Sequence, residues 1–256
     1  MKVIISPAKS LEFKKHIPYE TYSKPEFLNC AEYLIEELKE LSKEEIGNLM
    51  NISYKLSEIN FYRYKSWNKN LHEGTRQAIY AFDGDVYKGL NSYDFNKSEI
   101  DFAQNNLRIL SGLYGVLRPL DLIKPYRLEM GIKLENDKGN NLYKYWEYRL
   151  TNYINNDLKE DKEKILLNLA SKEYSKVLNR GYMDKDIKII SPVFKEYKNN
   201  NYKIVAIYAK KARGLMAQYI IKNKINKLEE IKEFNLEGYA FREDMSTEET
   251  IVFTRG

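Results

Sequence analysis

One stretch near the middle of the chain, residues 111–131 (SGLYGVLRPLDLIKPYRLEMG), constrains the fold more than any other. Its glycines and prolines exclude one continuous helix, because proline removes a backbone donor and glycine favours turns. Its leucine, isoleucine, valine and tyrosine side chains are too apolar for a surface loop. The stretch therefore predicts either a buried connection between packed elements or a glycine hairpin that holds a phosphate.

Apolar runs and helical periodicities alternate along the chain without a strict strand–helix–strand rhythm. Short runs such as KILLNLA are typical of buried strands, whereas apolar residues three and four positions apart predict amphipathic helices. The predicted strands are 2–6, 78–82, 164–170 and 249–255, together with a hairpin of 187–197 and 202–209. The predicted helices are 25–41, 52–66, 141–158 and 212–223. Two more helices are predicted to start at capping patterns, Ser42 with Glu45 and Ser98 with Asp101.

These elements indicate an α+β fold with a mixed sheet and surrounding helices, because at least one strand pair is antiparallel. No repeat, low-complexity tract or linker divides the chain, so we expect a single domain over residues 1–256 and a monomer. The helical segment 25–75 is the candidate for a subdomain.

Composition excludes several classes of protein. No window approaches about 18 uninterrupted apolar residues, which excludes a transmembrane helix. The first residues lack the apolar region of a signal peptide, so we expect a cytoplasmic protein without membrane contact. The single cysteine excludes a disulfide within the chain, and the two histidines have no metal-ligand spacing. We therefore expect no cofactor and no metal site, with a carboxylate-only metal site left open.

The net charge of +5 is modest, so the clustering of basic residues matters more than their number. In the central segment, Gly112 and Gly115 permit a tight reversal whose backbone N–H groups can face an anion. The basic residues around this turn are Arg108, Arg118, Lys124 and Arg127. The alternative is a structural turn whose arginines pair with Asp121 or Glu129.

A second basic cluster lies in YAKKARGLM, residues 208–216. A strand that ends near Ala209 and a helix that begins near Ala212 would place Lys210, Lys211 and Arg213 at a helix N-terminus. Three cations are unfavourable there unless an anion compensates them, because the N-terminus itself carries partial positive charge. The segment therefore indicates an anion site, or else a solvated basic corner.

The loop SPAKS after the first strand contributes Lys9 and Ser10, and strand ends commonly present functional groups. The motifs GxGxxG, GxSxG and HExxH are absent, so nothing in the sequence requires a catalytic function. If the protein is an enzyme, Glu129 and Glu173 are the carboxylates we would assign as general base.

Five segments together resemble the YaaA family of peroxide-stress-resistance proteins, and the resemblance runs from end to end. They are IISPAKS (4–10), AFDGDVYKGL (81–90), LRILSGLYGVLRPLDLIKPYRLEMG (107–131), NLASKEYSKV (168–177) and YAKKARGLM (208–216). Two short motifs near the end, GYAF (238–241) and a closing VFTR (252–255), agree with them. The resemblance implies a role in surviving hydrogen peroxide, in limiting free iron and in protecting DNA. It also implies a positively charged cleft and a helix-hairpin-helix-like element that binds duplex DNA, for which residues 111–131 are the best match.

Two functions follow from these features. The first is a protein of the oxidative-stress response that binds duplex DNA without sequence preference, with Lys9, Ser10 and the basic residues above on phosphates. The second is an enzyme that acts on a nucleotide or another phosphorylated small molecule in the same cleft. Direct sequestration of iron by carboxylates is a third option. A groove of duplex width would favour DNA, whereas a closed pocket of roughly 300–1,000 Å³ would favour a small ligand.

Overall fold

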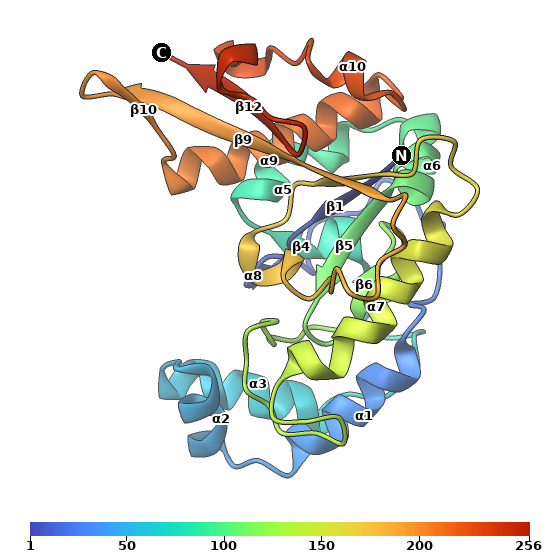
Figure 1. Cartoon of the computed structure of the whole chain (residues 1–256). Helices are drawn as coiled ribbons and strands as arrows, with labels where there is room; N and C mark the ends of the chain where they lie inside the picture. The colour runs from blue at the N-terminus through green and yellow to red at the C-terminus, as the bar shows by residue number, and fades with distance from the viewer.

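The computed structural model describes all 256 residues, and its centre is an eight-stranded sheet in the order β11-β12-β9-β8-β1-β5-β6, with β10 paired to β9 (Figure 1). The strands are β1 (Lys2–Ile5), β5 (Leu107–Ser111), β6 (Gly115–Leu117), β8 (Ile165–Asn168), β9 (Lys188–Lys198), β10 (Asn201–Lys203), β11 (Ala240–Phe241) and β12 (Thr250–Arg255). The strands β5, β1, β8, β9 and β12 run parallel, while β6, β10 and β11 pair antiparallel with their neighbours. The predicted mixed sheet is confirmed.

Helices surround this sheet, and two short strand pairs lie beside it. The helices are α1 (Leu28–Lys39), α2 (Lys43–Met50), α3 (Tyr54–Ser66), α4 (Ala78–Ala81), α5 (Asp85–Leu90), α6 (Lys97–Asn106), α7 (Leu142–Leu158), α8 (Lys172–Ser175), α9 (Ala206–Lys222) and α10 (Leu228–Ile231), with 3₁₀ turns at Ser92–Asp94, Leu236–Gly238 and Glu243–Met245. The short pairs are β2 (Ser10–Leu11) with β4 (Phe82–Asp83) and β3 (Arg76–Gln77) with β7 (Leu122–Ile123). In Figure 1, α1, α2 and α3 form a layer at the end of the molecule opposite α10.

Several sequence predictions are confirmed. The apolar runs at 2–6, 164–170 and 249–255 form β1, β8 and β12, whose central residues are buried as expected for strands of a covered parallel sheet. The helix over 141–158 is α7. Ser42 and Glu45 form the expected capping box, in which the Ser42 hydroxyl accepts from the Glu45 N–H at 3.2 Å.

Three other predictions are wrong. Residues 78–82 form the helix α4 before the short strand β4, because a brief apolar run that is buried on all sides has no diagnostic period. The helix predicted to be capped at Ser98 is capped at Asn96, whose side-chain oxygen accepts from the Glu99 N–H at 3.0 Å. The hairpin of β9 and β10 is present, but its second strand ends at Lys203 and α9 begins at Ala206.

A close crossing of α5 and α9 fixes how the second basic cluster sits in the fold. A Cβ atom on Gly214 of α9 would lie 1.9 Å from the Val86 carbonyl oxygen, and one on Gly89 of α5 would lie 2.2 Å from the Lys211 carbonyl oxygen. Only glycine permits the two backbones to approach this closely. The crossing therefore holds the α9 cations beside the start of α5.

The helices α1–α3 pack on one another, and two buried aromatic residues at the end of this segment are among those that join it to the rest of the protein. Tyr64 donates a hydrogen bond to the Arg127 carbonyl oxygen, and the Trp67 indole donates to the Tyr114 hydroxyl at 3.1 Å. Both contacts reach the central stretch, so residues 111–131 form one of the surfaces against which the helical layer packs, another being α7.

Candidate functional site

A cavity of about 300 Å³ opens beyond the carboxyl ends of β1 and β8. Its walls come from residues 6–10, 83–87, 129, 171, 173–174, 210 and 213. In open sheets with parallel strands, ligands commonly bind in a crevice outside the carboxyl ends of those strands. We refer to this cavity as the strand-end cleft.

Hydroxyl groups connect the segments that form the floor of the strand-end cleft. Ser6 directly follows β1, and its hydroxyl accepts a hydrogen bond from the Ser171 N–H at 2.8 Å. The two serine hydroxyl oxygens are 3.3 Å apart, and Tyr87 of α5 donates to the Ser6 carbonyl oxygen at 3.2 Å. The loops after β1 and β8 are thereby held against α5 without any ligand.

Two cations of α9 face the strand-end cleft without a partner in the protein. Arg213 is partly buried and makes no hydrogen bond or ion pair, and burial lowers the pKa of its guanidinium. Lys210 is exposed at the opening and is also unpaired. A guanidinium withdrawn from water is costly unless an anion or an acceptor compensates it, so Arg213 favours an anion in this cleft.

Glu129 is the most buried carboxylate of the strand-end cleft, with 8% of its surface exposed. Its Oε1 atom accepts from Arg127 Nε at 3.0 Å and Nη2 at 2.8 Å, and Lys9 Nζ lies 3.4 Å away. Its Oε2 atom is buried and has no hydrogen-bond partner. The glutamate is thus held firmly through one oxygen while the other remains unsatisfied.

The charge of the strand-end cleft is mixed rather than uniformly basic. Its basic residues are Lys9, Lys210 and Arg213. Its acidic residues are Asp83, Asp85, Glu129 and Glu173. The cleft therefore offers an unmatched cationic side on α9 and carboxylates on the loops, an arrangement that suits a ligand with both an anionic group and hydrogen-bond donors.

The structure brings together candidate residues from all three segments that the sequence singled out. Lys9, Ser10, Glu129, Glu173, Lys210 and Arg213 all line the strand-end cleft. Arg127 borders an adjoining hollow, where it holds Glu129. The remaining candidate residues lie outside the cleft.

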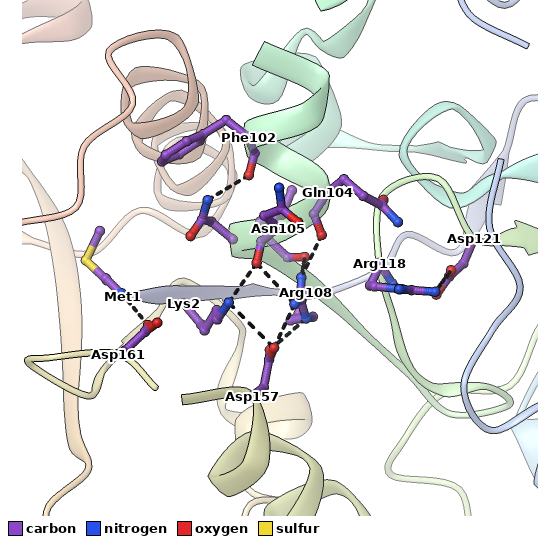
Figure 2. A network of polar contacts seen from close by, with 12 residues as sticks. Met1, Lys2, Phe102, Gln104, Asn105, Arg108, Arg118, Asp121, Asp157 and Asp161 are labelled. Carbon is purple, nitrogen blue, oxygen red and sulfur yellow. Dashed lines mark hydrogen bonds and ion pairs between the residues drawn. The ribbon is translucent and has the colours of Figure 1, made fainter. Parts of the chain in front are cut away.

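Arg108, a phosphate-binding candidate in the sequence, is buried in the structure and lies outside the strand-end cleft. Its side chain is 4% exposed and forms an ion pair with Asp157, with Arg108 Nε 2.8 Å from Asp157 Oδ2 (Figure 2). It also donates to the carbonyl oxygens of Gln104, Asn105 and Leu107 at 2.8–3.1 Å. Arg108 joins β5 to α6 and α7 through hydrogen bonds from both terminal nitrogens of its guanidinium.

The glycine turn is also buried. Gly112 and Gly115 join the antiparallel strands β5 and β6, so the elements that flank this turn are strands and the segment is a β-hairpin. A Cβ on Gly112 would lie 2.2 Å from the Leu128 carbonyl oxygen, and one on Gly115, where φ is +70°, would lie 2.7 Å from the Trp146 ring. The glycines serve close packing, and their N–H groups do not face an anion site.

Three further basic candidates lie outside the strand-end cleft with partners of their own. Arg118 pairs with Asp121 at 3.3 Å, as Figure 2 shows, and Lys124 donates to Asn68 Oδ1 at 2.8 Å. Lys211 pairs with Glu237. Lys210, Lys211 and Arg213 lie within α9 rather than at its N-terminus, since the helix begins at Ala206.

Ser171, Asp83 and Asp85 also line the cleft but were not among the sequence candidates, whereas Ser6 belongs to the SPAKS loop that the sequence singled out. Ser171 follows a strand that was correctly predicted, so the rule that strand ends carry functional groups could have identified it. Asp83 and Asp85 flank Gly84 directly after the predicted strand 78–82, where no candidate was named.

The protein has neither a cluster of metal ligands nor a helix suited to crossing a membrane. No group of three or more His, Cys, Asp or Glu side chains is arranged to hold a metal ion. None of the helices has the length and apolar character needed to cross a membrane.

The fold and the site define an α/β protein with a ligand-sized cleft at the carboxyl ends of its parallel strands. Residues 1–245 match the family model described as peroxide stress protein YaaA. A UPF0246 protein of Aliivibrio fischeri is 46% identical over all 256 residues of this chain and 98% of its own length. A UPF0246 protein of Idiomarina loihiensis is 47% identical with the same coverage. The chain therefore belongs to the YaaA family of peroxide stress proteins.

Proposed function

We propose that the protein serves peroxide resistance in the cytoplasm by binding a small phosphorylated molecule in the strand-end cleft. The observation that carries this proposal is Arg213, a partly buried guanidinium that lines the cleft and has no partner in the protein. A phosphate would supply the missing acceptors through short, charge-assisted hydrogen bonds. Lys210, exposed on the same helix and unpaired, adds a second cation for the same group.

The size of the strand-end cleft supports a small ligand over a nucleic-acid duplex. Its volume of about 300 Å³ lies at the lower end of the range for small-molecule sites, roughly 300–1,000 Å³. The carboxylates Asp83, Asp85 and Glu173 line the same cavity, so its cations form no continuous basic track for the phosphate backbone of DNA. The same cleft would serve an enzyme, with the exposed Glu173 as its general base.

Duplex DNA is the second candidate ligand, favoured by the exposed cations at the opening of the cleft. The Lys9 side chain is 67% exposed, and Lys210 is exposed without a carboxylate partner. In that case, log K for DNA would fall with log[salt] by about 0.9 for each phosphate contact. Under either candidate, the protein would limit iron-dependent damage indirectly.

Calorimetric titration with ribose 5-phosphate and AMP, and separately with a DNA duplex, tests the proposal. Arg213→Met keeps the apolar stem and removes the charge, and it should weaken binding of the phosphate esters by about 10- to 100-fold, because hydrogen bonds to charged groups contribute about 1.5–3 kcal/mol. Lys211→Met is the matched control, since Lys211 is a neighbouring cation of α9 that pairs with Glu237 outside the cleft.

Equal affinity in Arg213→Met and the wild type would contradict the proposal. Tight, salt-dependent binding of the duplex, together with no measurable binding of either phosphate ester, would favour the DNA candidate instead. Thermal unfolding of both variants separates a local loss of ligand contacts from a general loss of structure.

A further inference from the structure

The buried oxygen Oε2 of Glu129 is the second unsatisfied polar group of the strand-end cleft, after the Arg213 guanidinium. It has no hydrogen-bond partner although the glutamate is only 8% exposed. Leaving a buried acceptor unpaired is unfavourable, and more so when the group is charged. The residue lines the cleft, but Oε2 itself is closed to solvent, so the carboxylate has to turn toward the cleft for a donor on a bound ligand to satisfy this oxygen.

The partners of Glu129 indicate what kind of donor would bind there. Arg127 and Lys9 already place two cations around Oε1, at 2.8 Å and 3.4 Å. The negative charge is therefore compensated within the protein, and an ammonium group on the ligand would add a third cation. A neutral O–H group satisfies the free oxygen without adding charge.

Other side chains of the strand-end cleft agree with a hydroxyl-bearing ligand. Ser6, Ser10 and Ser171 line the cavity with hydroxyl groups that can both donate and accept. The aromatic lining residues, Tyr87 and Tyr174, are only 8% and 7% exposed, so neither offers an open ring face on which a base can stack. The polar interior thus matches a sugar better than a nucleobase.

From these observations we propose that Glu129 Oε2 accepts a hydrogen bond from a sugar hydroxyl, and that the ligand is a phosphorylated sugar, either free or as part of a nucleotide. This inference rests on the proposed function, because the phosphate is assigned to Arg213 and Lys210. The strand-end cleft then has two recognition sides, with α9 binding the phosphate and the segment after β7 binding the sugar.

The test compares two phosphate esters that differ only in their hydroxyl groups. Ribose 5-phosphate carries the ring hydroxyls, whereas tetrahydrofurfuryl phosphate has a similar ring without them. For the wild-type protein, we expect ribose 5-phosphate to bind at least about tenfold more tightly, as expected for one hydrogen bond to a charged group. In Glu129→Gln, the amide can still hydrogen-bond to a hydroxyl but lacks the charge that strengthens the bond, so this difference in affinity should fall several-fold.

Both ligands are measured on the same variant, so a change in its overall stability affects both affinities alike and cancels in their ratio. Glu135→Gln is the matched control, because Glu135 is an exposed glutamate on the same segment that does not line the cleft. It should retain the wild-type ratio. Titration with AMP distinguishes a nucleotide from a free sugar phosphate by whether AMP or ribose 5-phosphate binds more tightly.

The inference and the proposed function fail in different ways. If wild type binds both esters equally, or if Glu129→Gln keeps the wild-type ratio, the sugar inference is overturned. The proposed function then stands as long as Arg213→Met weakens both esters. If neither ester nor AMP binds the wild-type protein, both the proposed function and the inference are overturned.

Discussion

The crossing of α5 and α9 predicts that a single methyl group at position 214 will both destabilise the protein and disturb the strand-end cleft. In Gly214→Ala, the new Cβ would lie 1.9 Å from the Val86 carbonyl oxygen and 2.8 Å from the Leu90 nitrogen. Both contacts are with backbone atoms, so no side-chain rotation relieves them. Ordinary contact begins at 3.4 Å, so the helices would have to separate by about 1.5 Å in a close-packed interior.

The expected cost follows from two opposing effects. Overpacking of this kind costs about 1–3 kcal/mol, and a clash between backbones belongs at the upper end. Replacing glycine by alanine inside a helix recovers about 1 kcal/mol. The net loss is therefore about 2 kcal/mol, which corresponds to a fall in Tm of roughly 4–8 °C for a chain of this size.

The same separation would move Arg213 and Lys210 away from the opposite wall at residues 83–87, so affinity for ribose 5-phosphate should fall as well. Thermal unfolding and calorimetric titration measure the two effects. Gly47→Ala is the control, because its Cβ would lie an ordinary 3.6 Å from its nearest neighbours. That variant should gain about 0.5–1 kcal/mol from helix propensity. If Gly214→Ala were as stable as the wild type, the account of the helix crossing would be refuted.

Two other predictions concern ion pairs outside the strand-end cleft. Asp157→Ala should lower the free energy of unfolding by about 3 kcal/mol in urea denaturation, because it leaves the buried Arg108 guanidinium without its carboxylate. The affinity for ribose 5-phosphate should stay unchanged. A loss of unfolding free energy below about 1 kcal/mol would contradict the structural role of Arg108. The Lys211 hydrogen bond lowers the pKa of Glu237, so its contribution is present above the unfolded pKa and is lost as the pH falls through the folded pKa. The difference in unfolding free energy between wild type and Glu237→Gln should therefore be about 0.5 kcal/mol at neutral pH, since solvent screens the half-exposed pair. The difference should vanish in acid. A difference that grows in acid would contradict the predicted pH dependence.

The sequence correctly predicted those elements whose apolar pattern fits only one kind of secondary structure. The runs that became β1 and β8, and the long periodic segment that became α7, are of this kind. The first turn of α9 is different, because Ile207 and Tyr208 are 58% and 47% exposed. Exposed apolar residues there resemble a buried strand in the sequence, and only the tertiary structure separates the two.

The candidate site was predicted in part, for related reasons. Lys9, Lys210 and Arg213 were singled out by charge near predicted strand ends, and the sheet topology brings them together. Arg108, on the strand β5, carries the same charge signal, but its partner Asp157 lies 49 residues away on the helix α7 and could not be predicted from local pattern.

The role of the two central glycines was also ambiguous in the sequence. Gly112 and Gly115 were interpreted as a turn with open N–H groups, whereas the structure uses them for close approach to Leu128 and Trp146. Both uses require a residue without a side chain, so the sequence alone cannot separate them. Contacts with distant segments decide which use applies.

The most direct test of the central claim is to locate a phosphate analogue on the protein. A crystal structure with tungstate, whose anomalous scattering identifies its position, would show where the anion binds. We predict tungstate in the strand-end cleft, with its oxygens at about 2.7–3.2 Å from the Arg213 guanidinium. Tungstate bound only elsewhere, for example beside Arg118 or Lys124, with the cleft free of the anion, would contradict the account.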